Sequence, residues 1–338
     1  MKPSVFLTGA SGFLGRHILD GALAEGAAVS ALVRGGALDP LAEAHPALTL
    51  VRGDLGEPGR YAGFLGGQVV LHAAATAPAW GSYALCRARS AELTRGLVDA
   101  CVQQGAARLV MLSATDVYGA VLEGVVTEEH PVAARGELCG DTHLDAEGIA
   151  LEAHRAGALE VVILRAALCY GRHDRTFLPR LAQDLLRGAC AIIGDGTARP
   201  LLCDATRLAA CAWAAATAPA AAAGQVYNVA DADSRLNWGE LLTQVNADLR
   251  SPFAIKRVPG WVAGLACAAS ESLGHLVGSR EAPRLTRHVF EIFTARHRLS
   301  VAKAIERLGW TPRADAASGL LEHVEWFAPI LRGNRGVA

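Results

Sequence analysis

Short apolar runs and longer segments of helical period alternate along the first half of the chain. The runs are apolar at successive positions rather than at every second one, which is typical of strands buried on both faces of a parallel sheet. They stand at 5–8, 27–34, 48–51, 68–72 and 108–112. Directly after the first run, Leu14, Ile18 and Ala22 share one face of a helix. The alternation predicts an α/β protein with a doubly wound parallel sheet.

Three glycines spaced three residues apart follow the first apolar run, at Gly9, Gly12 and Gly15. In a strand–turn–helix unit, the first permits a sharp turn and the second lets the backbone approach a pyrophosphate. The third lets the helix pack close to the strand. The helix N-terminus then offers free N–H groups to phosphates. The stretch predicts a Rossmann-type dinucleotide site at Gly9, Ser11, Gly12, Phe13, Leu14 and Gly15. A glycine-rich turn without a ligand is the alternative.

Further cofactor contacts are expected where the next strands end. Arg34 stands where dinucleotide folds often place an acid for the ribose hydroxyls, and a guanidinium matches a 2′-phosphate instead. This favours NADP(H) over NAD(H), although a solvated loop arginine is the alternative. Asp54, followed by Leu55, ends the third strand and could accept from the adenine amino group. Ala73, Ala74 and Ala75 after the fourth strand are small enough for backbone to lie against the cofactor.

The regular alternation of strands and helices weakens beyond about residue 175. We expect a dinucleotide-binding Rossmann domain at 1–175, with sheet contributions from about 190–230, and a smaller substrate-binding lobe mainly at 176–338. Helices are predicted at 176–188, 206–218 and 238–250, with a short strand at 190–193. The stretch 252–298 reads as irregular and apolar, and its composition suggests a largely hydrophobic ligand. Within it, 258–278 contains Glu271 and several polar residues, which make it a poor membrane span, so we interpret it as a buried or lid-like helical segment. Contact with a membrane surface is the less favoured alternative.

Composition narrows the class of protein. A length of 338 residues with 51% hydrophobic residues suits one large α/β domain and a smaller lobe. A net charge of −1 argues against a nucleic-acid partner. Eight cysteines without a C-x-x-C pair indicate free thiols and no metal site. The first strand begins too early to leave room for a signal peptide, so a cytoplasmic enzyme with a small-molecule substrate is expected.

Taken together, these motifs resemble the extended short-chain dehydrogenase/reductase family, in its epimerase/dehydratase and 3β-hydroxysteroid dehydrogenase-like branches. The resemblance rests on 8–15, 53–55, 72–74, 113–119, 164–165, 170–171, 224–229 and 308–312. It implies a catalytic Ser or Thr, a Tyr, and a Lys four residues after the Tyr, with hydride transfer at the nicotinamide. It also implies a homodimer, and it places Ser113, His143 and Leu168 beside the cofactor. Arg172, His173 and Arg175 would form a basic cluster on the substrate side, or a surface cluster.

The chain departs from this family at its catalytic motif. The stretch His143-Leu144-Asp145-Ala146-Glu147 resembles the family's K-L-E-A-E, which puts Cys139 in the place of the tyrosine and His143 in that of the lysine. No Tyr or Lys occurs between Tyr118 and Tyr170. The Ser/Thr position falls on Ala114. The candidate catalytic residues are therefore Cys139, His143, Thr115 and Ser113, with Asp116 as a further acid.

With Cys139 and His143 in place of the tyrosine and lysine, three functions remain open. Cys139 and His143 are four residues apart on a helix and could form a thiolate–imidazolium pair. The first hypothesis is an NAD(P)-dependent oxidoreductase or epimerase that acts on a carbonyl or hydroxyl of a small, apolar metabolite, with a proton relay through His143, Thr115 or Asp116. The second is a non-redox enzyme for acyl transfer, hydrolysis or cyclisation, with Cys139 as nucleophile. The third is a catalytically silent dinucleotide-binding protein in which both residues only pack.

Overall fold

The central feature of the computed structural model is a parallel sheet that confirms the expected fold class. The structure describes residues 2–35, 38, 44–74, 80–119, 123–279 and 281–333. Within them, seven parallel strands lie in the order β3-β2-β1-β4-β5-β7-β11. They are β1 (Val5–Thr8), β2 (Val29–Val33), β3 (Leu48–Arg52), β4 (Val69–His72), β5 (Arg108–Ala114), β7 (Val161–Ala166) and β11 (Gln225–Val229). This order reverses direction next to β1, which places a crevice at the carboxyl ends of β1 and β4.

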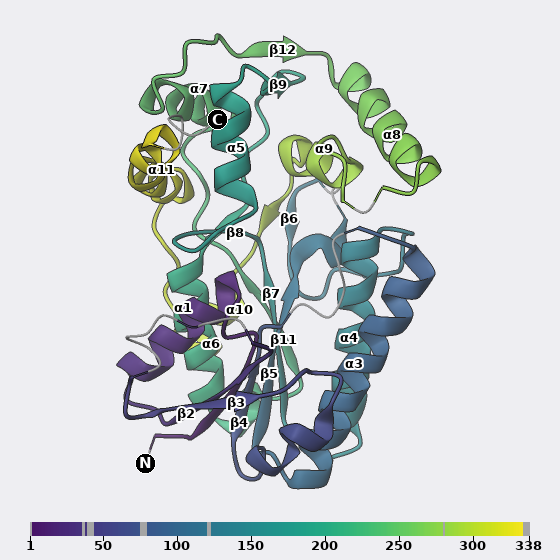
Figure 1. Cartoon of the computed structure of the whole chain (residues 1–338), viewed down its shortest axis with the longest axis vertical. Helices are drawn as coiled ribbons and strands as arrows, with labels where there is room; N and C mark the ends of the chain where they lie inside the picture. Colours follow the sequence, from purple (N-terminus) through teal and green to yellow (C-terminus); the bar gives the residue numbers. More distant parts are fainter. Residues whose placement is uncertain are drawn as a thin grey trace.

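Helices cover both faces of this sheet (Figure 1). On one face lie α1 (Phe13–Ala24), α6 (Ala205–Thr217) and α10 (Ala302–Leu308), and on the other lie α3 (Tyr83–Gln104) and α4 (Leu138–Arg155). The strands are buried on both sides because successive side chains point to opposite layers. Thus Val5 and Leu7 belong to the first core, whereas Phe6 belongs to the second. Short 3-10 turns stand at Pro58–Arg60, Ala62–Phe64, Thr115–Tyr118 (η3) and Ala220–Ala222.

A second lobe lies beyond the carboxyl ends of the strands, in the upper part of Figure 1. Its core forms between α5 (Phe177–Leu186), α7 (Trp238–Asp248) and α11 (Ala316–Gly333), around the buried Trp238. Three parallel strand pairs connect its parts. They are β8 (Leu168–Tyr170) with β10 (Leu202–Asp204), β9 (Ala191–Ile193) with β12 (Lys256–Val258), and β6 (Val125–Val126) with β13 (Arg298–Leu299).

The stretch 252–298 is irregular only in part, because it contains two helices. Residues Gly260–Leu276 form helix α8, and Arg287–Thr294 form helix α9. Helix α9 was not predicted, whereas α8 confirms the helical segment expected at 258–278. The large side chains of α8 are exposed rather than buried, which also corrects the expectation of a buried segment. In the part of the chain that the structure describes, no helix combines the length and the apolarity needed to cross a bilayer.

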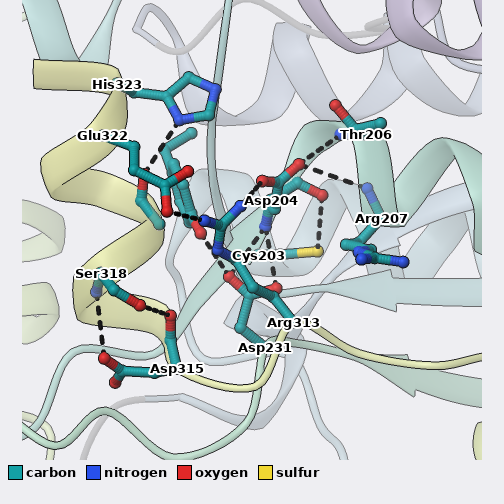
Figure 2. Close-up of polar contacts among 12 residues, drawn as sticks. Cys203, Asp204, Thr206, Arg207, Asp231, Arg313, Asp315, Ser318, Glu322 and His323 are labelled. Carbon is teal, nitrogen blue, oxygen red and sulfur yellow. Dashed lines mark hydrogen bonds and ion pairs between the residues drawn. The ribbon is translucent and has the colours of Figure 1, made fainter. Parts of the chain in front are cut away.

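A polar network ties α11 to the strand ends (Figure 2). Arg313 lies between Asp204 and Glu322 and is ion-paired with both. The backbone N–H of Asp204 also donates to the carboxylate of Asp231, 3.1 Å away, and the hydroxyl of Tyr170 donates to the same carboxylate over 2.7 Å. Burial raises the pKa of Asp231 to about 6. The carboxyl group of Asp231 thus keeps its proton to a higher pH in the folded protein than in the unfolded chain.

This raised pKa predicts a pH-dependent stability. The pKa of Asp231 is ~3.9 in the unfolded chain and about 6 in the folded protein. At a pH between these two values, the folded state retains a proton that the unfolded state releases. The contribution of Asp231 to stability therefore falls as the pH rises. Asp231→Asn cannot ionise. Relative to the native protein, its free energy of unfolding should therefore increase by about 2 kcal/mol between pH ~4.5 and ~7.5 in urea titrations. Asp233→Asn, at an exposed neighbour, is the control. A constant difference across this range would contradict the prediction.

Candidate active site

The glycine loop is fixed by backbone contacts that exclude side chains. Gly9 has a φ of +78°, and its carbonyl accepts the N–H of Gly12 over 2.8 Å. A Cβ on Gly9 would stand 2.6 Å from the backbone of Ala73 and Ala74, and a Cβ on Gly15 would overlap the carbonyl of Gly9. The loop therefore lies directly against the end of β4, as the spacing predicts. Ala75 falls outside the described residues.

The turn into α1 fits a dinucleotide pyrophosphate. No side chain caps the helix at Gly12, and its first turn carries no acid, so an anion would meet N–H groups and the positive end of the dipole. Ser11 is exposed at this turn. Phe13 and Leu14 are half-buried, and Leu14 packs against the core of the sheet. The residues present thus fit the bound nicotinamide dinucleotide that the fold implies.

The residues predicted for the adenosine end lie together only in part. Nη1 of Arg34 stands 3.9 Å from Oδ2 of Asp54, and the Arg34 side chain is 84% exposed. Oδ1 of Asp54 accepts the N–H of Gly56 over 2.8 Å. Leu55, by contrast, is buried in the core, and its carbonyl accepts from the hydroxyl of Tyr61. Arg34 and Asp54 remain accessible to a ligand, whereas the side chain of Leu55 is committed to packing.

Ser113, expected among the catalytic residues, is turned away from the crevice. Its buried hydroxyl donates to Oε1 of Glu147 over 2.6 Å. Glu147 also accepts two hydrogen bonds from Arg165, at 2.9 and 2.6 Å, and Arg165 donates to the hydroxyl of Tyr118. This network clamps α4 onto β5 and β7. Because its hydroxyl proton is held by a buried carboxylate, Ser113 supports the scaffold rather than a reacting oxygen. The half-buried Thr115 stays at the strand end.

The surroundings of Cys139 disfavour the thiolate that the sequence suggested. Its Sγ donates to Oδ2 of Asp116 over 3.2 Å. Burial, followed by the carboxylates of Asp116 and Glu137, raises the pKa of Cys139 well above its usual range. Glu137 caps α4 by accepting the N–H of Gly140, so a carboxylate already occupies the helix N-terminus. Burial also lowers the pKa of His143. These surroundings favour the neutral thiol and the neutral imidazole over the expected thiolate–imidazolium pair.

Two histidines of the crevice differ in their surroundings. His72 is buried, and its Nδ1 lies 2.7 Å from the hydroxyl of Thr8. Burial, and after it the neighbouring His143, lowers the pKa of His72 to about 4, so this ring stays neutral and structural, as its place in a buried strand suggested. His143 is only half-buried and lies one helical turn from Cys139. It can donate or accept a hydrogen bond in its neutral form.

Helix α9 contributes two residues that the sequence had not indicated. Nδ1 of His288 lies 3.9 Å from Oδ1 of Asp116, and both side chains are partly exposed. Glu291 stands one turn further along, and burial, then the charge of Glu137, raises its pKa. An imidazole beside a carboxylate is an acid–base pair. The spacing of His288 and Glu291, three residues apart on an amphipathic helix, was the signal that the sequence offered. Only the fold, however, brings His288 to Asp116.

The loop after β8 lies on the cofactor side of the crevice. Nε2 of His17 is 2.8 Å from the carbonyl of Arg172, and the His17 ring packs edge-on against Phe13 and His173. Arg172 and His173 thus lie beside the first turns of α1, and all three residues of the basic cluster are exposed, which fits the surface alternative. Leu168, in β8, is half-buried against the core of the second lobe, and its side chain contributes to that packing.

The sheet order and the glycine loop against β4 define a Rossmann-type dinucleotide-binding protein. The model of the NAD-dependent epimerase/dehydratase family matches residues 5–230. The chain belongs to this family, within the extended short-chain dehydrogenases/reductases. Membership confirms the resemblance drawn from the sequence and the expectation of an NAD(P)-dependent enzyme of the oxidoreductase or epimerase type.

Several characterised proteins are similar over nearly the whole length. A 2-alkyl-3-oxoalkanoate reductase of Stenotrophomonas maltophilia is 30% identical over 329 residues, which cover 94% of this chain and 97% of the relative. A dTDP-glucose 4,6-dehydratase of an Actinoplanes species is 26% identical and covers 98% of each chain. The solved dTDP-glucose 4,6-dehydratase of Streptomyces venezuelae with NAD bound has the same fold, with a TM-score of 0.75 at 22% identity over 98% of each chain.

Proposed function

We propose that this protein is an NAD(P)-dependent reductase of a ketone group in an apolar 3-oxo acid. The observation that carries the proposal is the pairing of Asp116 with His288 at the end of β5. Strand β5 lies beside β4, and the end of β4 contacts the glycine loop. The pair offers a proton donor in a site that has lost the family's tyrosine. The similarity to a 2-alkyl-3-oxoalkanoate reductase supports the substrate class, as does the apolar composition of the second lobe.

Different residues of this chain would bind the cofactor, donate the proton and orient the ketone. The glycine loop and the N-terminus of α1 hold the dinucleotide, which supplies the hydride when bound. His288 donates a proton to the ketone oxygen as the general acid, and Oδ1 of Asp116 lies 3.9 Å from its Nδ1 and orients the ring. Thr115 donates a hydrogen bond to the same oxygen, and neutral His143 takes the place of the family's lysine beside the nicotinamide ribose. The side chain of His288 is 37% exposed, so solvent returns its proton.

The direct test is an assay of the purified protein with NADPH and a synthetic 2-alkyl-3-oxoalkanoate. We expect substrate-dependent loss of the reduced nicotinamide absorbance and a 3-hydroxy product by mass spectrometry. dTDP-glucose serves as the comparison substrate, because an epimerase or dehydratase would convert it without net consumption of cofactor. Conversion of the sugar nucleotide with no reduction of the oxo acid would contradict the proposed substrate class.

NADP(H) is the proposed cofactor, and Arg34 is its proposed selector. The exposed guanidinium ends β2 next to Asp54, where it can meet a 2′-phosphate. Arg34→Ala should weaken NADPH binding about tenfold and leave NADH binding within about twofold, because a charge-assisted hydrogen bond contributes about 1.5–3 kcal/mol. Fluorescence titration of both nucleotides measures this. Arg52→Ala, at the end of the neighbouring strand, is the control. Equal losses for both nucleotides would refute a role in selection.

The same proposal includes a cytoplasmic homodimer. All eight cysteines are free thiols, which suits a reducing compartment. Helices α3 and α4 pack against each other, and α3 leaves Leu85 71% exposed on its outer side. These helices flank the Cys139 segment and are the expected dimer face in this family.

A further inference from the structure

Helix α8 directs its large apolar side chains outward. Trp261, Leu265, Leu273, Leu276 and Val277 have exposed fractions of 73%, 65%, 59%, 84% and 67%. They are three, four or eight residues apart for the most part, so they lie on one side of the helix. At ~1.5 Å per residue they form an apolar stripe about 24 Å long. We call these five residues the outer stripe.

The inner side of α8 contains the small residues. A Cβ on Gly264 would touch the ring of Phe290 in α9 at 3.7 Å, Cys267 is only 2% exposed, and Gly274 packs against Trp80. A helix on the surface of a water-soluble protein normally shows the opposite arrangement, with its large apolar side chains toward the core. A continuous exposed apolar patch of this kind marks a surface that binds something.

The charges around α8 favour an anionic occupant. Between residues 251 and 277 the charged side chains are Lys256, Arg257 and Glu271. Glu271 faces α9, where its carboxylate is 3.4 Å from Nε of Arg287. Lys256 and Arg257 are both exposed in β12, just before the helix begins, and the guanidinium of Arg257 donates to the carbonyl of Asp195 over 3.2 Å. Because neighbouring side chains of a strand point to opposite sides, Lys256 is the cation left without this contact. The outer stripe therefore carries no acid, and Lys256 precedes it in the chain.

We propose that the outer stripe lies on the surface of a bilayer that contains anionic phospholipid. Hydrocarbon side chains along the stripe would enter the acyl boundary, Trp261 would sit at the headgroup level, and Lys256 would meet a lipid phosphate. Protein interfaces, in contrast, surround their apolar centre with a polar rim and numerous hydrogen bonds. The stripe offers few such groups, and this favours lipid over a protein partner.

The position of α8 would bring the attached membrane close to the crevice. Helix α9 lies between α8 and the carboxyl edge of the sheet (Figure 1) and packs against α8. The stripe and His288 are thus carried by one pair of helices, with the lipid on one side and the crevice on the other. If the proposed reductase activity is correct, an apolar substrate dissolved in the bilayer would reach the site beneath the same helices. The attachment itself does not depend on that activity.

Flotation with vesicles tests the attachment without any substrate. The full-length protein should float with vesicles of equimolar phosphatidylcholine and phosphatidylglycerol, less with phosphatidylcholine alone, and less at high salt. Trp261→Ser/Leu265→Ser should lower the partition coefficient at least about tenfold. Lys256→Gln should lower it about fivefold and reduce the salt dependence, whereas Arg257→Gln, which changes the residue bonded to Asp195, should lower it less.

A matched double variant controls for general loss of surface apolarity. Phe64→Ser/Ile305→Ser changes two other exposed apolar side chains, 43% and 42% exposed, and should float like the native protein. Dinucleotide affinity should be unchanged in every variant, which confirms that the chain has folded. Absence of flotation with either vesicle overturns the proposal. So does concentration-dependent self-association in sedimentation that Leu265→Ser abolishes, because the stripe would then bind a second copy of this chain.

Discussion

Asp116→Asn is expected to lower kcat/KM for reduction of the oxo acid about 100-fold or more. Oδ1 of Asp116 lies 3.9 Å from Nδ1 of His288, and Oδ2 accepts from the thiol of Cys139 over 3.2 Å, so the change removes the carboxylate that orients the proposed proton donor. General acid catalysis by a positioned side chain typically contributes about 10²–10⁴-fold. Steady-state rates with NADPH measure the effect. Asp99→Asn, exposed on α3, is the matched control and should keep the native rate.

The partner residue sharpens this test. His288→Asn should cause a loss of similar size, and the double variant should be little worse than either single variant, since the two residues act as one unit. NADPH affinity should stay the same in all three. Full activity in Asp116→Asn would remove the pair from the mechanism, and strictly additive losses would show that the two residues act independently.

Glu147→Gln is expected to cost about 3–5 kcal/mol of folding free energy. The change leaves Arg165 without its carboxylate in a site where the side chains of Glu147 and Arg165 are 2% and 5% exposed. Removing one partner of a buried ion pair is costly because the other charge stays desolvated. Urea titration of the purified variant measures the loss. Glu152→Gln, exposed on the same helix, should change stability by less than about 0.5 kcal/mol.

A second variant separates the ion pair from the shape of the site. Glu147→Leu/Arg165→Met removes both charges together and should be more stable than Glu147→Gln, because no buried charge is left alone. A double variant less stable than Glu147→Gln would indicate that the hydrogen bonds of Ser113 and Tyr118, rather than the buried charge, dominate the energy of this network.

The sheet and the glycine loop could be predicted because their signals are local. A buried parallel strand is apolar at every position, and the spacing of Gly9, Gly12 and Gly15 encodes a turn whose contacts involve neighbouring segments. Helix boundaries are harder to predict, as the start of α3 at Tyr83 shows. Its first turns carry polar residues whose role depends on α4, for example the bonds from Arg87 to Asp145.

The chemistry of the site was harder to predict because it depends on residues far apart in the chain. The hydroxyl of Ser113 had the right position for catalysis, but it bonds to Glu147, 34 residues away. His288 belongs to no motif and meets Asp116 only through the packing of α9. The protonation of Cys139 likewise depends on the carboxylates of Asp116 and Glu137, which lie on different elements. Spacing along the helix could not reveal any of these contacts.

The division of the acid–base pair between two lobes constrains how this enzyme can evolve. In its relatives' pattern, the expected tyrosine and lysine share one helix of the dinucleotide-binding domain, so the substrate lobe can diverge freely around a fixed reaction. Here Asp116 belongs to the sheet edge and His288 to α9, in the lobe that we propose binds the substrate. A mutation that reshapes α9 for a new substrate would also displace the proposed proton donor. Substrate range and turnover should therefore change together in this lineage, and selection for one will limit the other.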